Sequence, residues 1–152
     1  MIEFTVYGTP APAGSKRAFA IKGRPGRFAV TDDSKRSRPW KTQVAQQAGE
    51  IMQGRQLLDG PLDLTLTFYV RRPKGHFGAR GNVKPSAPVY PAVKPDVLKL
   101  ARGVEDALSG VVYRDDAQIV TEILMKRYGE PERVEISVRE QQGAQISTEK
   151  VA

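Results

Sequence analysis

The stretch KPDVLKLARGVEDALSGVVYRDDAQ, from Lys94 to Gln118, combines an amphipathic helix pattern with a group of carboxylates. At about 100° per residue, one face is apolar throughout, which predicts that it packs on a sheet. This face carries Val97, Leu100, Ala101, Val104, Ala107 and Leu108, and the other side carries Asp96, Lys99, Arg102 and Asp106. Leu98 also falls on the polar side, well off the apolar face. We predict a helix over about 95–109, a turn at Gly110 and a strand over about 117–128.

Alternating apolar and polar residues predict further strands around this stretch. The alternation is most regular over 62–70, residues 2–7 are typical of an edge or half-buried strand, and residues 134–138 place three apolar side chains inward. A helix is expected over about 39–53, and residues 22–26 are expected to turn a short hairpin. Together these elements predict an α+β fold, a mixed sheet with two helices packed on it and long basic loops.

Length and composition predict one domain over 1–140, followed by a flexible polar tail over 141–152. Residues 71–94 break all periodicity, and so long a loop is usually either functional or disordered. The chain contains no cysteine, which excludes disulfides and thiolate metal sites. The N-terminus lacks a signal-peptide pattern and no apolar run approaches ~20 residues, so we expect an intracellular soluble protein.

The net charge of +7 is unevenly distributed. Residues 1–95 carry a balance of +10, whereas residues 96–152 carry −3. A basic surface favours an acidic partner such as nucleic acid, although solubility alone explains the charge equally well. Carboxylates gathered where a polyanion binds would repel it unless they hold divalent cations.

Each acidic residue taken alone has a structural explanation. Asp96 follows Pro95 and suits a helix cap, Asp106 suits a surface pair with Arg102, and Asp115-Asp116 suits a turn before a strand. Their combination favours a metal-dependent enzyme that acts on nucleic acid, because Mg²⁺ prefers carboxylate oxygens, water and phosphate. Lys99 and Arg102 are the candidates to stabilise the negative charge of the transition state.

The same residues resemble the RusA family of Holliday junction resolvases, in the form common in phages and prophages. The resemblance rests on Asp96-Val97-Leu98-Lys99-Leu100-Ala101-Arg102, then Asp106-Ala107-Leu108, then Asp115-Asp116-Ala117-Gln118. It implies a Mg²⁺-dependent endonuclease, with Mn²⁺ as a substitute, that forms a homodimer and resolves four-way DNA junctions by paired nicks in the bacterial cytoplasm. Gln118 matches the motif, but the sequence gives it no role.

The resemblance also implies roles for individual residues. Asp96 and Asp116 would be metal-binding catalytic carboxylates, with Asp106 and Asp115 as further ligands or their support. Arg102 stands where the family usually has a catalytic lysine. Leu98 stands where the family typically has a second aspartate, so metal affinity would weaken or shift to Asp106, Asp115 or Glu105. A catalytically weak or inactive junction-binding protein of the same fold is therefore the alternative.

Two basic segments are the predicted DNA-binding surface, because contacts of Lys and Arg with phosphates need no particular sequence. The residues expected to bind DNA are Lys16, Arg17, Arg71, Arg72, Lys74, Arg80, Lys84 and Lys94. Phe77 or Tyr90 would stack at an opened branch point, although packing within the loop is the more common role of such residues. His76 is expected to make a loop contact, and Trp40 to lie in the core.

Overall fold

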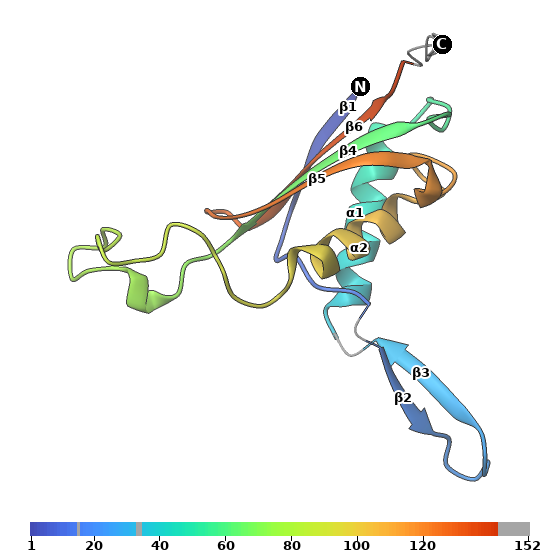
Figure 1. Ribbon diagram of the computed structural model, residues 1–152, viewed down its shortest axis with the longest axis horizontal. Helices are drawn as coiled ribbons and strands as arrows, with labels where there is room; N and C mark the ends of the chain where they lie inside the picture. Colours follow the sequence, from blue (N-terminus) through green and yellow to red (C-terminus); the bar gives the residue numbers. More distant parts are fainter. Residues whose placement is uncertain (15, 33–34, 143–152) are drawn as a thin grey trace, which may run out of the picture.

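The computed structural model describes residues 1–14, 16–32 and 35–142, and of residues 16–19 and 30–32 it describes only the backbone. Four strands form one sheet in the order β1-β6-β4-β5 (Figure 1). They are β1 (Ile2–Tyr7), β4 (Leu62–Val70), β5 (Ile119–Tyr128) and β6 (Arg133–Glu140). β6 runs antiparallel to β1 and β4, whereas β4 and β5 are parallel. The predicted mixed sheet is confirmed, with β1 at one edge.

One face of the sheet is apolar because alternate residues of its strands point the same way. The register pairs Leu64 with Val138 and Leu66 with Ile136 on β4 and β6, and these four side chains are buried. Both helices cover this face: α1 (Ser37–Ile51) contacts β1, and α2 (Val97–Leu108) contacts α1 and β5. The core residues of α1 include Trp40, as predicted.

Helix α1 begins and ends two residues before its predicted bounds. The helix predicted within the stretch from Lys94 to Gln118 begins at Val97, because Asp96 has extended backbone angles, and it ends at Leu108. The predicted strand begins later than expected, at Ile119, because Asp116–Gln118 form one turn of 3-10 helix, η2. The sequence pattern therefore located both α-helices and the four strands of the sheet, but it did not predict the 3-10 turns and missed the exact ends.

An N-terminal strap, residues 11–13, crosses the outer side of α2. The amide of Ala13 donates to the carbonyl of Lys99 at 2.9 Å, and both Ala11 and Ala13 are buried. A Cβ at Gly103 would lie only 3.3 Å from the carbonyl oxygen of Ala11. The missing side chain at this helical position therefore lets the strap approach α2 closely.

Two basic arms project from the body of the molecule (Figure 1). The hairpin arm consists of β2 (Lys16–Ala20) and β3 (Phe28–Asp32), joined by the predicted turn. The loop arm, residues 71–95, contains a short 3-10 helix, η1 (Lys74–His76), and an antiparallel bridge between Phe77 and Val83. None of the helices within the described ranges is long and apolar enough to cross a membrane. Most of the predicted tail, residues 143–152, lies outside the described residues.

Candidate active site

Asp115 and Asp116 have different roles although they are adjacent. Asp115 precedes η2, and its Oδ1 accepts the amide of Ala117 at 2.9 Å. This hydrogen bond, and then one shared with Asp116, lower the pKa of Asp115. The pKa of Asp116 is raised, first by its hydrogen bond with Asp115, then by burial and by the charges of Asp115 and Asp106. Asp115 thus acts as a structural cap that positions the carboxylate of Asp116.

Gln118 has a structural role that the sequence could not reveal. Its Oε1 accepts the amides of Arg114 and Asp115 at 2.9 and 3.1 Å. Its Nε2 donates to the carbonyls of Leu58 and Gly60 at 3.2 and 3.0 Å. One side chain therefore completes the capping of η2 and fastens the Asp116 turn to the segment before β4.

Glu105 is the centre of an acidic group that also contains Glu122 and Asp116. Burial, a hydrogen bond with Glu122 and the charges of Glu122, Asp116 and Asp106 raise the pKa of Glu105 to about 8. Glu105 comes from α2, Glu122 from β5 and Asp116 from η2. Negative charge from three elements therefore acts on Glu105, which makes this region attractive to a cation.

Glu122 was missed by sequence reasoning, and Glu105 was considered only as a distant substitute for Leu98. Glu122 pairs with Leu64 in the register, which places it on the helix-covered face of edge strand β5. The sequence signal that could have identified Glu122 is a charged residue on the face of β5 that otherwise points toward the core.

Asp106 lies beside α1 and not beside its expected partner. Its carboxylate is 3.2 Å from the ammonium of Lys41 on α1, so the predicted surface pair with Arg102 is wrong. The reason is tertiary, because the crossing of the two helices places a closer cation next to Asp106. Arg102 instead packs against the strap: a Cβ at Gly14 would lie 2.9 Å from its Cδ.

Asp96 is the N-cap residue of α2, yet its side chain makes no capping hydrogen bond. The cap explanation is therefore wrong for its carboxylate. Asp96 lines a cleft of about 290 Å³ with Pro12, Pro95 and two lysines, Lys94 and Lys99. The ammonium of Lys126, on β5, donates to the carbonyls of Val93 and Pro95 at 2.5 and 3.0 Å. Lys126 therefore fixes the chain that leads into Asp96.

The predicted carboxylates divide into two groups along α2. Asp96 and Asp106 are ten residues apart, which is about 15 Å along a helix axis, so they cannot ligate the same ion. Among the described residues, no three acidic or histidine side chains are placed to enclose a metal ion by themselves. A Mg²⁺ ion usually needs only one or two carboxylates, with water and substrate phosphate completing its shell.

Leu98 separates the two acidic groups. Its side chain is 70% exposed, which confirms that it lies off the apolar face of α2. It precedes Glu105 by seven residues, or two helical turns, on the same side of the helix. An aspartate at this position would extend the Glu105 group toward Asp96.

Two predicted DNA-binding residues of the loop arm, Arg71 and Arg72, have partners within the chain. Arg72 donates to the carbonyl of Pro88 at 2.6 Å, and its Cζ lies 4.4 Å from the ring centroid of Tyr128. His76 packs edge-on against the same ring, as expected of a loop contact, and Arg71 pairs with Glu130 at 3.0 Å. Exposed cations remain at Lys74, Arg80, Lys84 and Lys94. The side chains of Lys16 and Arg17 lie outside the described residues.

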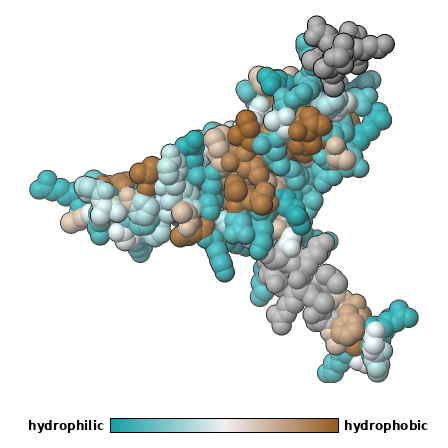
Figure 2. All heavy atoms as spheres, in the orientation of Figure 1, coloured by the Kyte–Doolittle hydropathy of each residue, from teal (hydrophilic) through white to brown (hydrophobic). Residues whose placement is uncertain are grey.

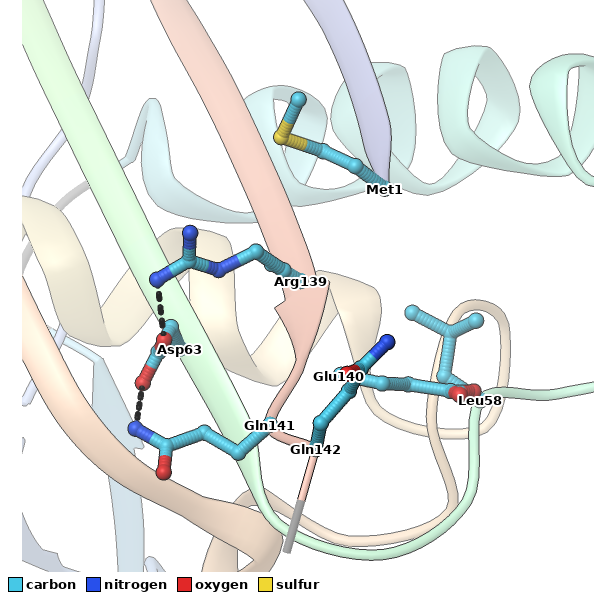
Figure 3. A pocket seen from close by; sticks show the side chains of 7 residues that line it. All are labelled: Met1, Leu58, Asp63, Arg139, Glu140, Gln141 and Gln142. Atoms are coloured by element: carbon cyan, nitrogen blue, oxygen red, sulfur yellow. Dashed lines mark hydrogen bonds and ion pairs between the residues drawn. The ribbon is translucent and has the colours of Figure 1, made fainter. Parts of the chain in front are cut away.

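A larger cavity, of about 770 Å³, lies at the far end of the sheet (Figure 3). There Asp63 accepts hydrogen bonds from Arg139 at 2.8 Å and from Gln141 at 2.5 Å. The hydrogen bond from Arg139 lowers the pKa of Asp63 most, and the one from Gln141 lowers it further. Because both of its oxygens are satisfied, Asp63 ties β4 to the end of β6 and is not a candidate metal ligand.

Comparison with known proteins gives a family match and a relative. Residues 8–139 match the family model of the endodeoxyribonuclease RusA. The chain is also similar to the uncharacterized protein YqaN of Bacillus subtilis (strain 168), with 33% identity over 141 residues, covering 91% of this chain and 96% of YqaN. The resemblance noted in the sequence is confirmed, and the matched range includes α2, η2 and β5.

Replacing Glu105 with glutamine is expected to change how stability depends on pH. Because folding raises this pKa from 4.5 to about 8, its stabilisation is complete below pH 4.5 and is lost as pH rises through about 8. In metal-free buffer, Glu105→Gln should match wild type near pH 4.5. At about pH 9 it should be more stable by about 1–2 kcal/mol, after allowance for solvent screening.

Urea denaturation at both pH values measures this difference, and Glu3→Gln, on the exposed face of the sheet, is the matched control. A stability difference between wild type and Glu105→Gln that is the same at both pH values would contradict the acidic group described here.

Proposed function

Because this chain belongs to the RusA endodeoxyribonuclease family, we propose that it is a Mg²⁺-dependent endonuclease that resolves Holliday junctions by paired, symmetric nicks in DNA recombination or repair. The observation that carries the proposal is the group of repelling carboxylates at Glu105, Asp116 and Glu122 in a chain of net charge +7. Carboxylates repel the phosphates of DNA, so DNA can bind beside such a group only when a cation neutralises the repulsion.

Asp116 is the principal ligand in this proposal, with Glu105 and Glu122 beside it. Asp115 holds the turn, and Asp106 contributes negative charge that Lys41 partly offsets. A bound Mg²⁺ or Mn²⁺ would lower the pKa of an attacking water and neutralise charge on the phosphate. One or two of these carboxylates suit an ion whose shell is completed by water and DNA phosphate.

Asp96 is proposed as the catalytic carboxylate of the other group. It stands between Lys94 and Lys99, whose ammonium groups would bind the phosphates on either side of the cut. Arg102, on the outer side of α2, would stabilise negative charge on the phosphate, but as a guanidinium it is a poor proton donor. These residues act on the strap side of α2, and the Asp116 group acts on the β5 side.

The two basic arms are proposed to hold the branched DNA. Lys74, Arg80 and Lys84 on the loop arm, and Lys22, Arg24 and Arg27 on the hairpin arm, expose cations that phosphates would neutralise. A four-way junction has approximate two-fold symmetry, so a symmetric homodimer would supply two equivalent sites. We place this activity in the cytoplasm of a bacterial host, where a phage or prophage protein would meet recombining DNA.

A catalytically weak or inactive junction-binding protein is the second candidate, and exposed Leu98 favours it. With no carboxylate between the two acidic groups, DNA would still bind the arms while hydrolysis lost one ligand. Both candidates share the fold and the partner, and they differ only in chemistry.

A four-way junction labelled on each strand tests the proposal directly. In Mg²⁺ the protein should introduce paired nicks near the branch point, and it should cut linear duplex and flap DNA far more slowly. Asp116→Asn should reduce cleavage by at least ~100-fold, because it removes the principal ligand, while junction binding persists. Glu3→Gln, which removes one exposed charge elsewhere, is the matched control.

Equal cutting of linear duplex would contradict the proposed junction selectivity. Junction binding without cleavage in Mg²⁺ or Mn²⁺ would select the inactive protein instead, and an Asp116→Asn variant that fails to bind DNA would contradict the role given to Asp116.

Leu98→Asp is expected to raise the cleavage rate by roughly tenfold, because one additional ligand strengthens cation binding. Rates at several Mg²⁺ concentrations measure the effect, and half-maximal activity should need less Mg²⁺ than in wild type. Leu57→Asp adds the same charge to an exposed loop position as a control. An unchanged or lower rate in Leu98→Asp would mean that the missing aspartate does not limit activity.

A further inference from the structure

The loop arm is a fixed projection rather than a loose connection. Arg72 holds its two limbs together by donating to the carbonyl of Pro88 while its guanidinium lies over Tyr128. Near the tip, the amide of Gly78 donates to the carbonyl of Asn82 at 2.8 Å. At the other end Lys126 bonds two carbonyls of the returning limb. The arm is therefore oriented relative to β5 and to the start of α2.

The two aromatic side chains of the arm differ in their surroundings. Phe77 is half-buried and its backbone forms the bridge with Val83. Tyr90 is 60% exposed, and it is flanked by exposed Val89 and Val93. Figure 2 shows apolar side chains along this arm among hydrophilic ones. A group of exposed apolar residues on a fixed segment marks a contact surface.

The backbone around Tyr90 is fixed on both sides. The Pro88 carbonyl accepts the bond from Arg72, Pro91 is buried against the body, and the amide of Ala92 donates to the carbonyl of Tyr90 at 2.9 Å. The ring is thus presented to solvent without much freedom of the main chain. A preorganised aromatic ring loses little entropy when a partner stacks on it.

The charge of the arm identifies the kind of partner. Residues 71–95 contain six Lys or Arg residues and no Asp or Glu. A second copy of the arm would therefore be repelled, whereas phosphates would be attracted. An exposed aromatic ring among cations suits a nucleic acid whose bases are accessible, because every base offers a face for stacking. In an intact duplex the faces of the bases are covered, but at an opened branch point they are not.

Tyr90 is also close to the candidate active site. It precedes Asp96 by six residues, so the two lie within about 20 Å even if the chain between them were fully extended. Lys94, one of the two lysines beside Asp96, belongs to the same limb. A base stacked on Tyr90 would consequently lie within a few nucleotides of the phosphate near Asp96.

From this placement we propose that Tyr90 stacks on an unpaired or unstacked base at the branch point of a four-way junction, while Lys84 and Lys94 bind the adjoining phosphates. This inference rests on the proposed function and names how the branch point is recognised. Phe77 serves the internal structure of the arm and takes no part in the stacking.

The test uses a junction with 2-aminopurine at the branch point, bound in Ca²⁺, together with a duplex of the same arm sequence. Wild-type protein should lower the 2-aminopurine emission on binding, because stacking on an aromatic ring quenches this base. Tyr90→Ala should lose most of this fall and bind the junction roughly 5- to 100-fold more weakly, while duplex affinity stays within about twofold because the phosphate contacts are unchanged. Tyr90→Phe, which keeps the ring, should behave like wild type.

Tyr7→Ala is the matched control, because Tyr7 is 59% exposed on β1 and lies outside both arms. If wild type binds the junction selectively but Tyr90→Ala behaves like Tyr7→Ala, the stacking inference is overturned and the proposed function stands. If wild type shows no preference for the junction over duplex, both the stacking inference and the proposed function are contradicted. If Tyr90→Ala changes the oligomeric state in light scattering, the exposed surface is a contact between copies, and this too overturns the inference.

Discussion

Parallel pairing of β4 with β5 requires the chain to cross back over the sheet between these strands, and α2 makes that crossing. The crossing has two consequences for the site. It places the side of α2 that carries Glu105 next to the exposed edge strand β5, where Glu105 meets Glu122. It also returns the chain through η2, which presents Asp116 to the same group. Without the parallel pair, these carboxylates would not meet.

Carboxylates that raise each other's pKa reduce stability at neutral pH, so their presence needs a compensating role. Two other acidic side chains have direct partners: Asp106 has Lys41, and Asp63 has Arg139 and Gln141. The Glu105–Asp116–Glu122 group instead consists of like charges within a chain of net charge +7. A cation held against DNA phosphate resolves this conflict, because it neutralises both the protein and the substrate.

Periodicity was enough to predict the two α-helices and the four strands of the sheet. The alternation over 62–70 and the helical spacing from Val97 to Leu108 are local patterns, and the buried faces follow from them directly. The off-face position of Leu98 was also visible, since it depends only on angle around the helix. The strand beginning at Ile119 was predicted slightly early because the η2 turn depends on capping by Asp115.

Contacts between residues distant in the sequence could not be predicted in this way. The partner of Asp106 comes from α1, and Gln118 binds carbonyls about sixty residues earlier. The meeting of Glu105 with Glu122 depends on the register of β5 against β4. Composition showed the loop arm to be basic, but only the packing of Arg72 on Tyr128 shows it to be a fixed projection.

The binding of Mn²⁺ in the presence of a four-way junction, followed by the electron paramagnetic resonance signal of free Mn²⁺, is the most direct test of the account. Wild-type protein with the junction should remove more free Mn²⁺ than the sum of what the DNA and the protein remove separately, and Asp116→Asn should abolish this excess. Equal uptake by Asp116→Asn, or no excess with wild type, would contradict a cation held between the Asp116 carboxylate group and DNA phosphate.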